Sequence, residues 1–359
     1  MSRNKRLHHI DAVKALAILC MVQVHTASLV SPVGVSITHP LALLSAAIGG
    51  MAAPLFVTLS GWGVHRAVKK RLSTRDLGRW LISRITLLVA MQLLVNLLLP
   101  QSFRWFTPGV LTLLALCTLL TPLSAKFFDK RASLLIFSLL VALSSLLPLD
   151  FGVSWSWGEL VYSSGGTEWL ARLFLNGTYP LLPWWSFFLA GGLLQDDNEG
   201  SDLRISGCTA LSVLAVTGGF ALISGSQWAL TSGDAVLTFF PSNLWFVLTA
   251  ATWSHFIWYS ACHMRQRAER LFAILAPAGA LSLSIYVIHF SILRLIVEYR
   301  PESLSIEVSF VMTLIHTAIW IPLAFFHQKY IPNFSLESIS HILVSFGQGD
   351  DERANAEQE

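Results

Sequence analysis

Long apolar runs separated by short polar segments fill most of this chain of 359 residues. Runs that are long enough to cross about 30 Å of hydrocarbon occur in ten places. They are 10–31, 41–64, 80–99, 109–125, 132–149, 179–195, 205–225, 235–260, 271–298 and 305–326. The pattern therefore predicts an all-α polytopic membrane protein, with about ten transmembrane helices in one bundle.

Composition agrees with this prediction. Hydrophobic residues make up 54% of the chain and charged residues only 13%, which is more apolar than a soluble domain of this length. The net charge of +3 is small, and the basic residues gather in short stretches between apolar runs. This distribution is typical of membrane topology, and we expect no nucleic-acid partner. The four cysteines lack the spacing of metal ligands, so we expect no metal site.

The basic stretches also predict an orientation. Arg3, Lys5 and Arg6 precede the first apolar run, and further cations follow the second, fourth and eighth runs. With ten spans, all of these stretches lie on one side, which the positive-inside rule makes cytoplasmic. We therefore expect both termini in the cytoplasm, a transmembrane domain over 1–335, and a partly disordered cytoplasmic tail over 336–359.

The first span carries two ionisable residues on one face. Lys14 and His25 are eleven residues apart in "DAVKALAILCMVQVH", which is about three helical turns or about 16 Å. A charged group in hydrocarbon is costly unless it faces a polar interior, so each such residue is a candidate site. Asp11 lies one turn before Lys14 and is expected to neutralise it. The alternative is structural, with an ion pair that anchors the helix and a histidine that is hydrogen-bonded to a neighbour.

The ninth span, "LSLSIYVIHFSILRLIVEY", carries a second polar set. Tyr286 and His289 fall in its outer half, at a depth similar to that of His25. Arg294 and Glu298 are four residues apart near the external end, where they are expected to form a structural ion pair. His289 is either a functional group or a satisfied core histidine.

Two further spans hold polar residues. Gln92 and Asn96 lie four residues apart on one face of the third span, where amides either join helices or face a site. His316 lies in the middle of the tenth span and has the same two interpretations as His289. The segment 150–177 is expected to lie at the external interface because of its tryptophans.

A basic cluster follows the second span. It contains Arg66, Lys69, Lys70 and Arg71, and Arg84 stands at the start of the third span. Clusters of this kind usually set topology and contact lipid headgroups. The same residues would also suit an anionic ligand.

The first two spans carry a more specific pattern. Lys14, ten further residues and His25 are followed in the next span by "LFVTLSGW", which contains Phe56, Ser60 and Gly61. This arrangement resembles the acyltransferase-3 family of membrane acyltransferases, in which Arg or Lys, ten residues and His precede an "FFxxSGF"-like segment. Three other segments, "PWWSFFLAGGLL", "NLL" from Asn96 and "LSLSIYVIH", resemble parts of this family and of the related heparan-alpha-glucosaminide N-acetyltransferase-like group.

The resemblance implies an activity. The chain would move an acyl group, with acetyl preferred, from cytoplasmic acyl-CoA to a hydroxyl or amine of a glycan or lipid-linked acceptor, in a bacterial cell membrane. Coenzyme A is a polyanion, and the cations that would hold it are Lys14, Arg66, Lys69, Lys70, Arg71 and Arg84. His25 would act as a base or as a transient acyl carrier. The groups that would stabilise the thioester oxyanion are Asn96, Tyr286 and His289.

Two other classes of function remain open from the residues alone. A transporter would use Lys14, His25, His289 and Glu298 as a substrate or proton path, although repeated halves are not visible in the chain. A membrane scaffold would use the polar face for packing only. The scaffold hypothesis predicts that His25→Ala leaves cellular function intact.

Overall fold

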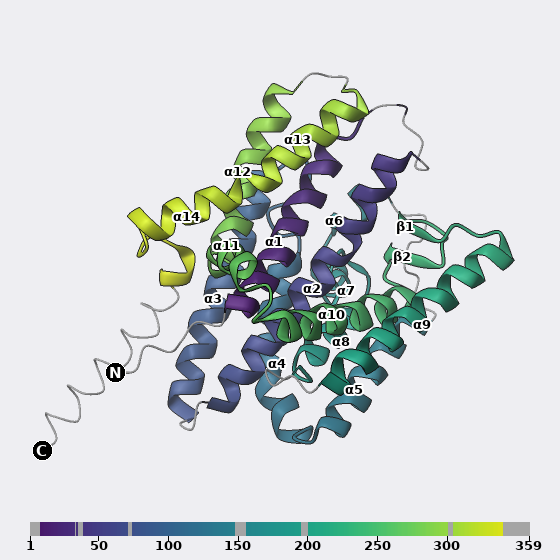
Figure 1. The fold of residues 1–359 in the computed structure, drawn as a ribbon, viewed down its shortest axis with the longest axis vertical. Coiled ribbons are helices and arrows are strands. Elements are labelled where there is room, and N and C mark those ends of the chain that lie inside the picture. The colour runs from purple at the N-terminus through teal and green to yellow at the C-terminus, as the bar shows by residue number, and fades with distance from the viewer. Residues whose placement is uncertain are drawn as a thin grey trace, which may run out of the picture.

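The computed structural model describes residues 8–32, 34, 39–70, 74–147, 156–194, 200–300 and 304–339. These residues form a helical bundle with α1 in its middle (Figure 1). The first long helices are α1 (His8–Leu29), α2 (Pro40–Lys70), α3 (Thr74–Leu98), α4 (Val110–Phe127) and α5 (Arg131–Leu143), and α5 runs into the 3₁₀ turn η1 (Ser144–Leu146). The short elements α6 (Trp157–Val161), α7 (Gly166–Ala171) and the π-helical η2 (Arg172–Asn176) follow.

The second half of the chain returns to the same bundle. It contains α8 (Leu181–Gly191), α9 (Gly200–Ser224), α10 (Leu244–Met264), α11 (Glu269–Ala280), α12 (Ser282–Tyr299), α13 (Ile306–Ala318) and α14 (Trp320–Tyr330). Two short strands, β1 (Ala229–Ser232) and β2 (Leu237–Phe240), pair between α9 and α10, with Ala229 opposite Leu237 and Ser232 opposite Phe240. They lie beside α9 at one edge of the molecule (Figure 1).

Within the described residues, seven helical stretches are long and apolar enough to span a membrane. They are His8–Leu29, Pro40–Lys70, Thr74–Leu98, Val110–Phe127, Asp202–Ser224, Ser282–Tyr299 and Ile306–Tyr330. Helix α10 and the shorter apolar stretches Arg131–Leu146 and Leu181–Gly191 occupy three other apolar runs. The predicted all-α polytopic membrane fold is confirmed, whereas the count of ten crossings and the cytoplasmic location of both termini stay predictions.

Three predicted spans differ in detail from the structure. The run 235–260 begins as strand β2, because Pro241 has no backbone N–H to donate and Asn243 caps a helix that starts only at Leu244. The run 271–298 breaks at Leu281 into α11 and α12, and the run 305–326 continues as α13 and α14. An apolar run fixes the depth of a segment without fixing where its helix is interrupted.

Some of the predicted features fall outside the described residues. These are Arg3, Lys5 and Arg6 before the first helix, Arg71 after α2, and most of the predicted tail, residues 340–359. Residues 336–339 at the start of that tail are helical.

Helix α1 is held by close packing with its neighbours. Its most extensive contact is with α11, and it also packs against α2, α13 and α12. Gly279 of α11 lies against the backbone of Asp11 and Ala15, so that an added methyl group there would collide with α1. Gly61 of α2 makes the same kind of close approach to the backbone of Phe188 in α8. The glycine of the "LSGW" segment therefore has a packing role, because small residues let membrane helices approach closely.

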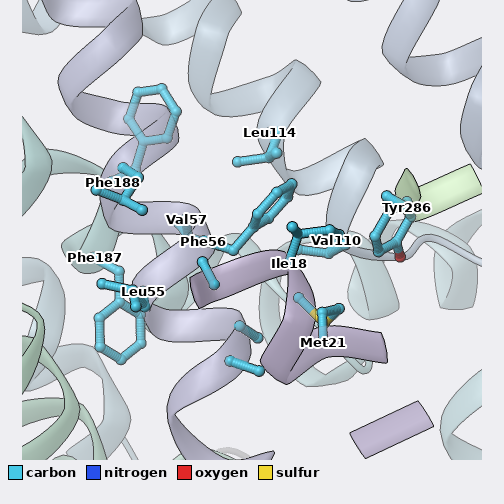
Figure 2. Close-up of a cluster of buried hydrophobic side chains, with 14 of the residues drawn as sticks. Ile18, Met21, Leu55, Phe56, Val57, Val110, Leu114, Phe187, Phe188 and Tyr286 are labelled. Carbon is cyan, nitrogen blue, oxygen red and sulfur yellow. The ribbon is translucent and has the colours of Figure 1, made fainter. Parts of the chain in front are cut away.

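Phe56 fills the centre of the core between these helices. It is 8% exposed and belongs to the main cluster of buried apolar side chains. Figure 2 shows it among Ile18 of α1, Val110 of α4 and Tyr286 of α12. Its ring stacks on that of Tyr286 at 6.0 Å between centroids. The phenylalanine of the second-span pattern thus supports the first half of α12.

The described part of the segment 150–177 contacts the loop between α3 and α4. The side chain of Ser156 and the carboxylate of Glu159 form a capping box at the start of α6. Trp157 and Trp169 donate from their indole N–H groups to the carbonyl oxygens of Ser102 and Phe106 in the loop between α3 and α4. The described part of the predicted interfacial segment is therefore fastened to this loop by its tryptophans.

Candidate active site

The histidines of the first and ninth predicted spans meet in the structure. Nδ1 of His25 lies 2.9 Å from Nε2 of His289, and the two rings are nearly parallel with centroids 5.2 Å apart. The two residues are far apart in sequence but lie on α1 and α12, which pack together. The prediction that His25 and His289 share one depth in the membrane is confirmed by this contact.

A backbone contact fixes the direction of the hydrogen bond between the histidines. Nδ1 of His289 lies 3.1 Å from the carbonyl oxygen of Ile285, one turn earlier in α12. Since a carbonyl oxygen only accepts, Nδ1 of His289 carries the proton and Nε2 of the neutral ring is the acceptor. His25 therefore donates from Nδ1. In the neutral ring of His25, Nε2 is then the nitrogen without a proton, which is the form that acts as a general base.

Aromatic rings enclose this pair. The ring of Phe290 lies 4.9 Å from His25 and 4.2 Å from His289, and that of Tyr286 lies 6.2 Å and 5.6 Å from the same two rings. His289 and Tyr286 are buried, with 0% and 4% exposed, whereas His25 is only half-buried. His25 is thus the more exposed member of the pair.

A third histidine lies beside the pair. The hydroxyl of Thr26 donates to the carbonyl oxygen of Val22 at 2.6 Å, so it accepts from Nδ1 of His316 at 2.8 Å. The rings of His289 and His316 are 6.5 Å apart. Within the described part of the chain, these histidines and the other possible ligands form no group that could hold a metal ion. His316 instead fixes α1 to α13 through the residue next to His25.

Two further contacts hold the same end of α1. The hydroxyl of Ser309 donates to the carbonyl oxygen of Val30 at 2.6 Å, and the guanidinium of Arg300 donates to that of Leu29. Free carbonyl groups at a helix end need such partners. The segment of α1 that carries His25 is thereby tied to both α12 and α13.

Lys14, on the same face of α1 as His25, lies among charged and aromatic side chains. Nζ of Lys14 lies 3.3 Å from a carboxylate oxygen of Asp11, which confirms the predicted pair. Lys14 also lies over the ring of Trp62 at 5.9 Å, and the guanidinium of Arg66 lies over the same ring at 5.3 Å. The ring of Trp258 packs on Trp62 at 5.0 Å. Lys14 and Arg66 are both half-buried, so this group, the Lys14–Trp62–Arg66 platform, presents two cations at an accessible surface.

The other predicted binders of coenzyme A are more dispersed. Lys69 and Lys70 are exposed at the end of α2, one turn beyond Arg66. Arg84 lies over the ring of Trp80 in α3, at 5.8 Å. Arg71 lies outside the described residues. The structure thus joins Lys14 with Arg66 on one tryptophan and leaves Lys69 and Lys70 at the edge.

Asn96 lies in another environment. Its amide nitrogen donates to the carbonyl oxygens of Trp105 and Thr107, and its oxygen accepts from Gln92 at 2.9 Å. Together with Gln92 it lines a pocket of about 590 Å³ between the second half of α3, the loop after it and the start of α7. The structure therefore gives Asn96 a structural role at the loop between α3 and α4, and it does not bring Asn96 to the histidine pair.

Glu298 is likewise separate from the pair. Its side chain is exposed near the end of α12, nine residues beyond His289, which is about 13 Å along the helix axis. Of the four residues in the predicted transport path, His25 and His289 come together and Lys14 lies about 16 Å along α1 from His25.

Sequence reasoning missed Trp62 and the link from Thr26 to His316. Trp62 stands four residues before Arg66, a spacing that puts the ring and the guanidinium on one helix face. That spacing could have predicted the contact between Trp62 and Arg66. The link from Thr26 to His316 joins α1 to α13 across 290 positions, and no local pattern indicates such a contact.

Comparison with known proteins gives a family match. A family model described as an acyltransferase domain, Acyl_transf_3, matches residues 7–327, a region that includes Lys14, His25 and His289. A search of curated proteins gave no match. The more specific likeness to the heparan-alpha-glucosaminide N-acetyltransferase-like group stays a prediction. The match spans most of the chain and agrees with the apolar helices, so this protein belongs to the acyltransferase-3 family and is an integral membrane acyltransferase.

Proposed function

We propose that the protein transfers an acyl group, preferably acetyl, from acyl-CoA to a hydroxyl or amine of a glycan or lipid-linked acceptor, with His25 as the general base. The observation that carries this proposal is the hydrogen bond from Nδ1 of His25 to Nε2 of His289 at 2.9 Å. It leaves Nε2 of neutral His25 as a proton acceptor, on a residue that is more exposed than His289.

The proposed reaction is balanced as follows. Nε2 of His25 removes the proton of the acceptor O–H or N–H while the acceptor atom forms a bond to the thioester carbonyl carbon. The tetrahedral intermediate then breaks its C–S bond, and the departing thiolate of coenzyme A takes the proton from His25. The products are the acylated acceptor and free coenzyme A, with His25 neutral again.

His289 and Tyr286 have supporting roles in this proposal. His289 accepts from Nδ1 of His25, which orients the imidazole and favours the charge that it acquires while it holds the proton. The ring of Tyr286 lies 6.2 Å from that of His25 and 5.6 Å from that of His289, between centroids. Its hydroxyl is the proposed donor to the oxyanion.

The Lys14–Trp62–Arg66 platform is the proposed site for the phosphates of acyl-CoA. Its two cations share one accessible ring, and charge-assisted hydrogen bonds to phosphate are among the stronger polar contacts. The separation of about 16 Å along α1 between Lys14 and His25 suits an extended pantetheine arm, with phosphates at one end and the thioester at the other.

The test uses the purified full-length protein in nanodiscs. Radiolabelled acetyl-CoA is supplied with membrane glycan and lipid fractions, and both label transfer and release of coenzyme A are followed. We expect transfer by the wild type and its loss in His25→Ala, while Cys20→Ala, a second change in α1, keeps the wild-type rate.

Two results would change the proposal. If folded wild-type protein neither transfers label nor releases coenzyme A across a broad panel of acceptors, the proposed reaction is wrong. If acid-quenched protein retains label on His25 in the absence of acceptor, the histidine is an acyl carrier and not only a base.

A further inference from the structure

A short segment beyond α14 is fastened to the start of α12. Glu337 accepts from the backbone N–H groups of Leu283 and Ser284 at 2.8 Å and 3.1 Å, and its second oxygen accepts from the hydroxyl of Ser284 at 2.6 Å. The backbone N–H of Leu336 donates to the same hydroxyl at 3.0 Å. One carboxylate and one hydroxyl thus join the two segments by four hydrogen bonds.

This contact meets a need of α12. The chain breaks between α11 and α12 at Leu281, and the first backbone N–H groups of the new helix have no partner within it. The side chain of a serine, threonine or aspartate just before the helix usually accepts hydrogen bonds from these N–H groups. Here the residue before the helix is Leu281, which has no such acceptor. A carboxylate from a distant part of the chain therefore caps α12 and also favours the positive end of its dipole.

Helix α12 carries the groups on which the proposed reaction depends. Tyr286 lies two residues after Ser284, and His289 lies a little more than one turn after it. Because a helix is stiff over this length, the position of its first turn sets where His289 meets His25. We propose that Glu337 is a positioning residue for the His25–His289 pair, an inference that rests on the proposed function of that pair.

The segment that brings Glu337 there is itself ordered by several contacts. Nε2 of His327 in α14 donates to the carbonyl oxygen of Phe334, and the hydroxyl of Ser335 accepts from the N–H of Ser338. The side chain of Leu336 packs against the main apolar cluster. Glu337 also lies beyond residue 327, where the family match ends. The functional unit of this chain therefore extends past its family domain, at least to Glu337.

The experiment compares full-length variants in nanodiscs. Glu337→Gln removes the charge and keeps the shape, Glu337→Ala removes both, and Glu337→Asp keeps the charge on a shorter arm. Glu269→Gln is the matched control, because Glu269 is an exposed carboxylate in the first turn of the neighbouring helix α11. Each variant is assayed for the kcat and KM of acyl-CoA turnover and for its unfolding temperature.

A second readout does not depend on turnover. Diethyl pyrocarbonate modifies unprotonated imidazole nitrogens, and peptide mass spectrometry gives its rate at His25 relative to that at His8, which is exposed at the start of α1. A change in this ratio reports on the setting of His25 and not on the amount of folded protein.

We expect Glu337→Gln to lower kcat about tenfold with KM for acyl-CoA changed by less than about twofold, since a small displacement of a catalytic group costs rate more than binding. The relative modification rate at His25 should fall severalfold, Glu337→Asp should keep part of both signals, and Glu269→Gln should match the wild type. Wild-type kcat and wild-type modification at His25 in both Glu337→Gln and Glu337→Ala would overturn the inference. If the wild type shows no turnover, the proposed function fails, and the modification ratio alone then decides the role of Glu337.

Discussion

Lys14 and His25 mark the two ends of a polar stripe on α1, and their surroundings differ in kind. At the His25 end, His25 donates a hydrogen bond to His289, and His289 donates one to the carbonyl oxygen of Ile285. Aromatic rings such as that of Phe290 lie beside the two histidines. At the end marked by Lys14, two cations lie over one tryptophan and reach an accessible surface. Both ends belong to one helix of 22 residues.

In the proposed function, the difference between these ends separates proton transfer from ligand binding. A neutral imidazole with a fixed tautomer takes and returns a proton, but it offers little affinity for a polyanion. Paired cations offer that affinity, but they do not accept a proton near neutral pH. The comparison therefore predicts that changes at the His25 end lower kcat, and that changes at the Lys14 end raise KM.

The largest effect is expected at His25. His25→Ala removes the proposed base and should lower kcat by about 10²- to 10⁴-fold, the usual contribution of a general base. Steady-state release of coenzyme A from the nanodisc-embedded protein measures this change. If kcat of His25→Ala stays within about a factor of two of the wild-type value, His25 is not the general base and the two ends of α1 do not differ in this way.

His289 should give the next largest effect. His289→Ala leaves Nδ1 of His25 without its acceptor and should lower kcat by about 10- to 100-fold, because the wrong tautomer becomes accessible. His289→Gln places an amide oxygen in reach of the same N–H and should recover part of the loss. If the glutamine and alanine variants are equally slow, the hydrogen bond between the rings is not what supports the rate.

Lys14 should affect binding. Lys14→Ala removes a charge-assisted contact to phosphate and should raise the KM for acyl-CoA about tenfold with a small change in kcat. Lys14→Arg keeps the charge and should remain close to the wild type. Added salt should raise the wild-type KM for acyl-CoA, because screening weakens exposed charge pairs. The KM values of wild type and Lys14→Ala should therefore become more alike as salt is added. Equal effects on kcat and KM would instead indicate that Lys14 positions the donor.

Trp62 should have a smaller effect at the same end. Trp62→Leu removes the ring over which Lys14 and Arg66 lie and should raise the KM about two- to fivefold, as expected for the loss of exposed cation–π contacts. Trp62→Phe keeps an aromatic face and should lose less. A larger fall in kcat than rise in KM would show that the ring supports α1 more than it supports the cations.

The smallest effect is expected outside α1, at Glu168 in α7. The backbone N–H and the hydroxyl of Ser164 donate to this carboxylate and hold its pKa below the ordinary value of 4.5, with a further contribution from Arg172. The contact therefore stabilises the folded state above about pH 4.5, and this contribution is lost as pH falls through the lower pKa of the folded protein. Between neutral pH and pH 3, the unfolding temperature of wild type should fall slightly further than that of Glu168→Gln. An identical fall in both proteins would contradict the contribution of Glu168.

Much of the fold follows from local pattern. Apolar runs of sufficient length locate the helices, and the spacing of Lys14 and His25 puts them on one face of α1 before any tertiary contact is known. The similar depth of His25 and His289 also follows from the runs. What the runs do not give is rotation, which decides whether two side chains at one depth meet.

Asn96 illustrates that limit. Its depth allowed a place beside His25, but the rotation of α3 turns it to the loop carbonyl groups of Trp105 and Thr107. Glu337 illustrates another limit. A charged segment near the end of the chain is usually a solvated tail, and only the break at Leu281 creates the helix terminus that a carboxylate there can cap.

The hydrogen-bonded series that begins at His25 ends at the carbonyl oxygen of Ile285, which is an uncharged group. A serine-protease histidine is hydrogen-bonded to a carboxylate that lowers the energy of its imidazolium, whereas the partner of Nδ1 of His25 among the described residues is the uncharged ring of His289. In the proposed reaction the imidazolium of His25 would therefore be short-lived, and its proton would pass to the sulfur soon after it leaves the acceptor. Under the proposed mechanism such timing would favour thioesters over oxygen esters as donors, because a thiolate departs readily and an alkoxide does not.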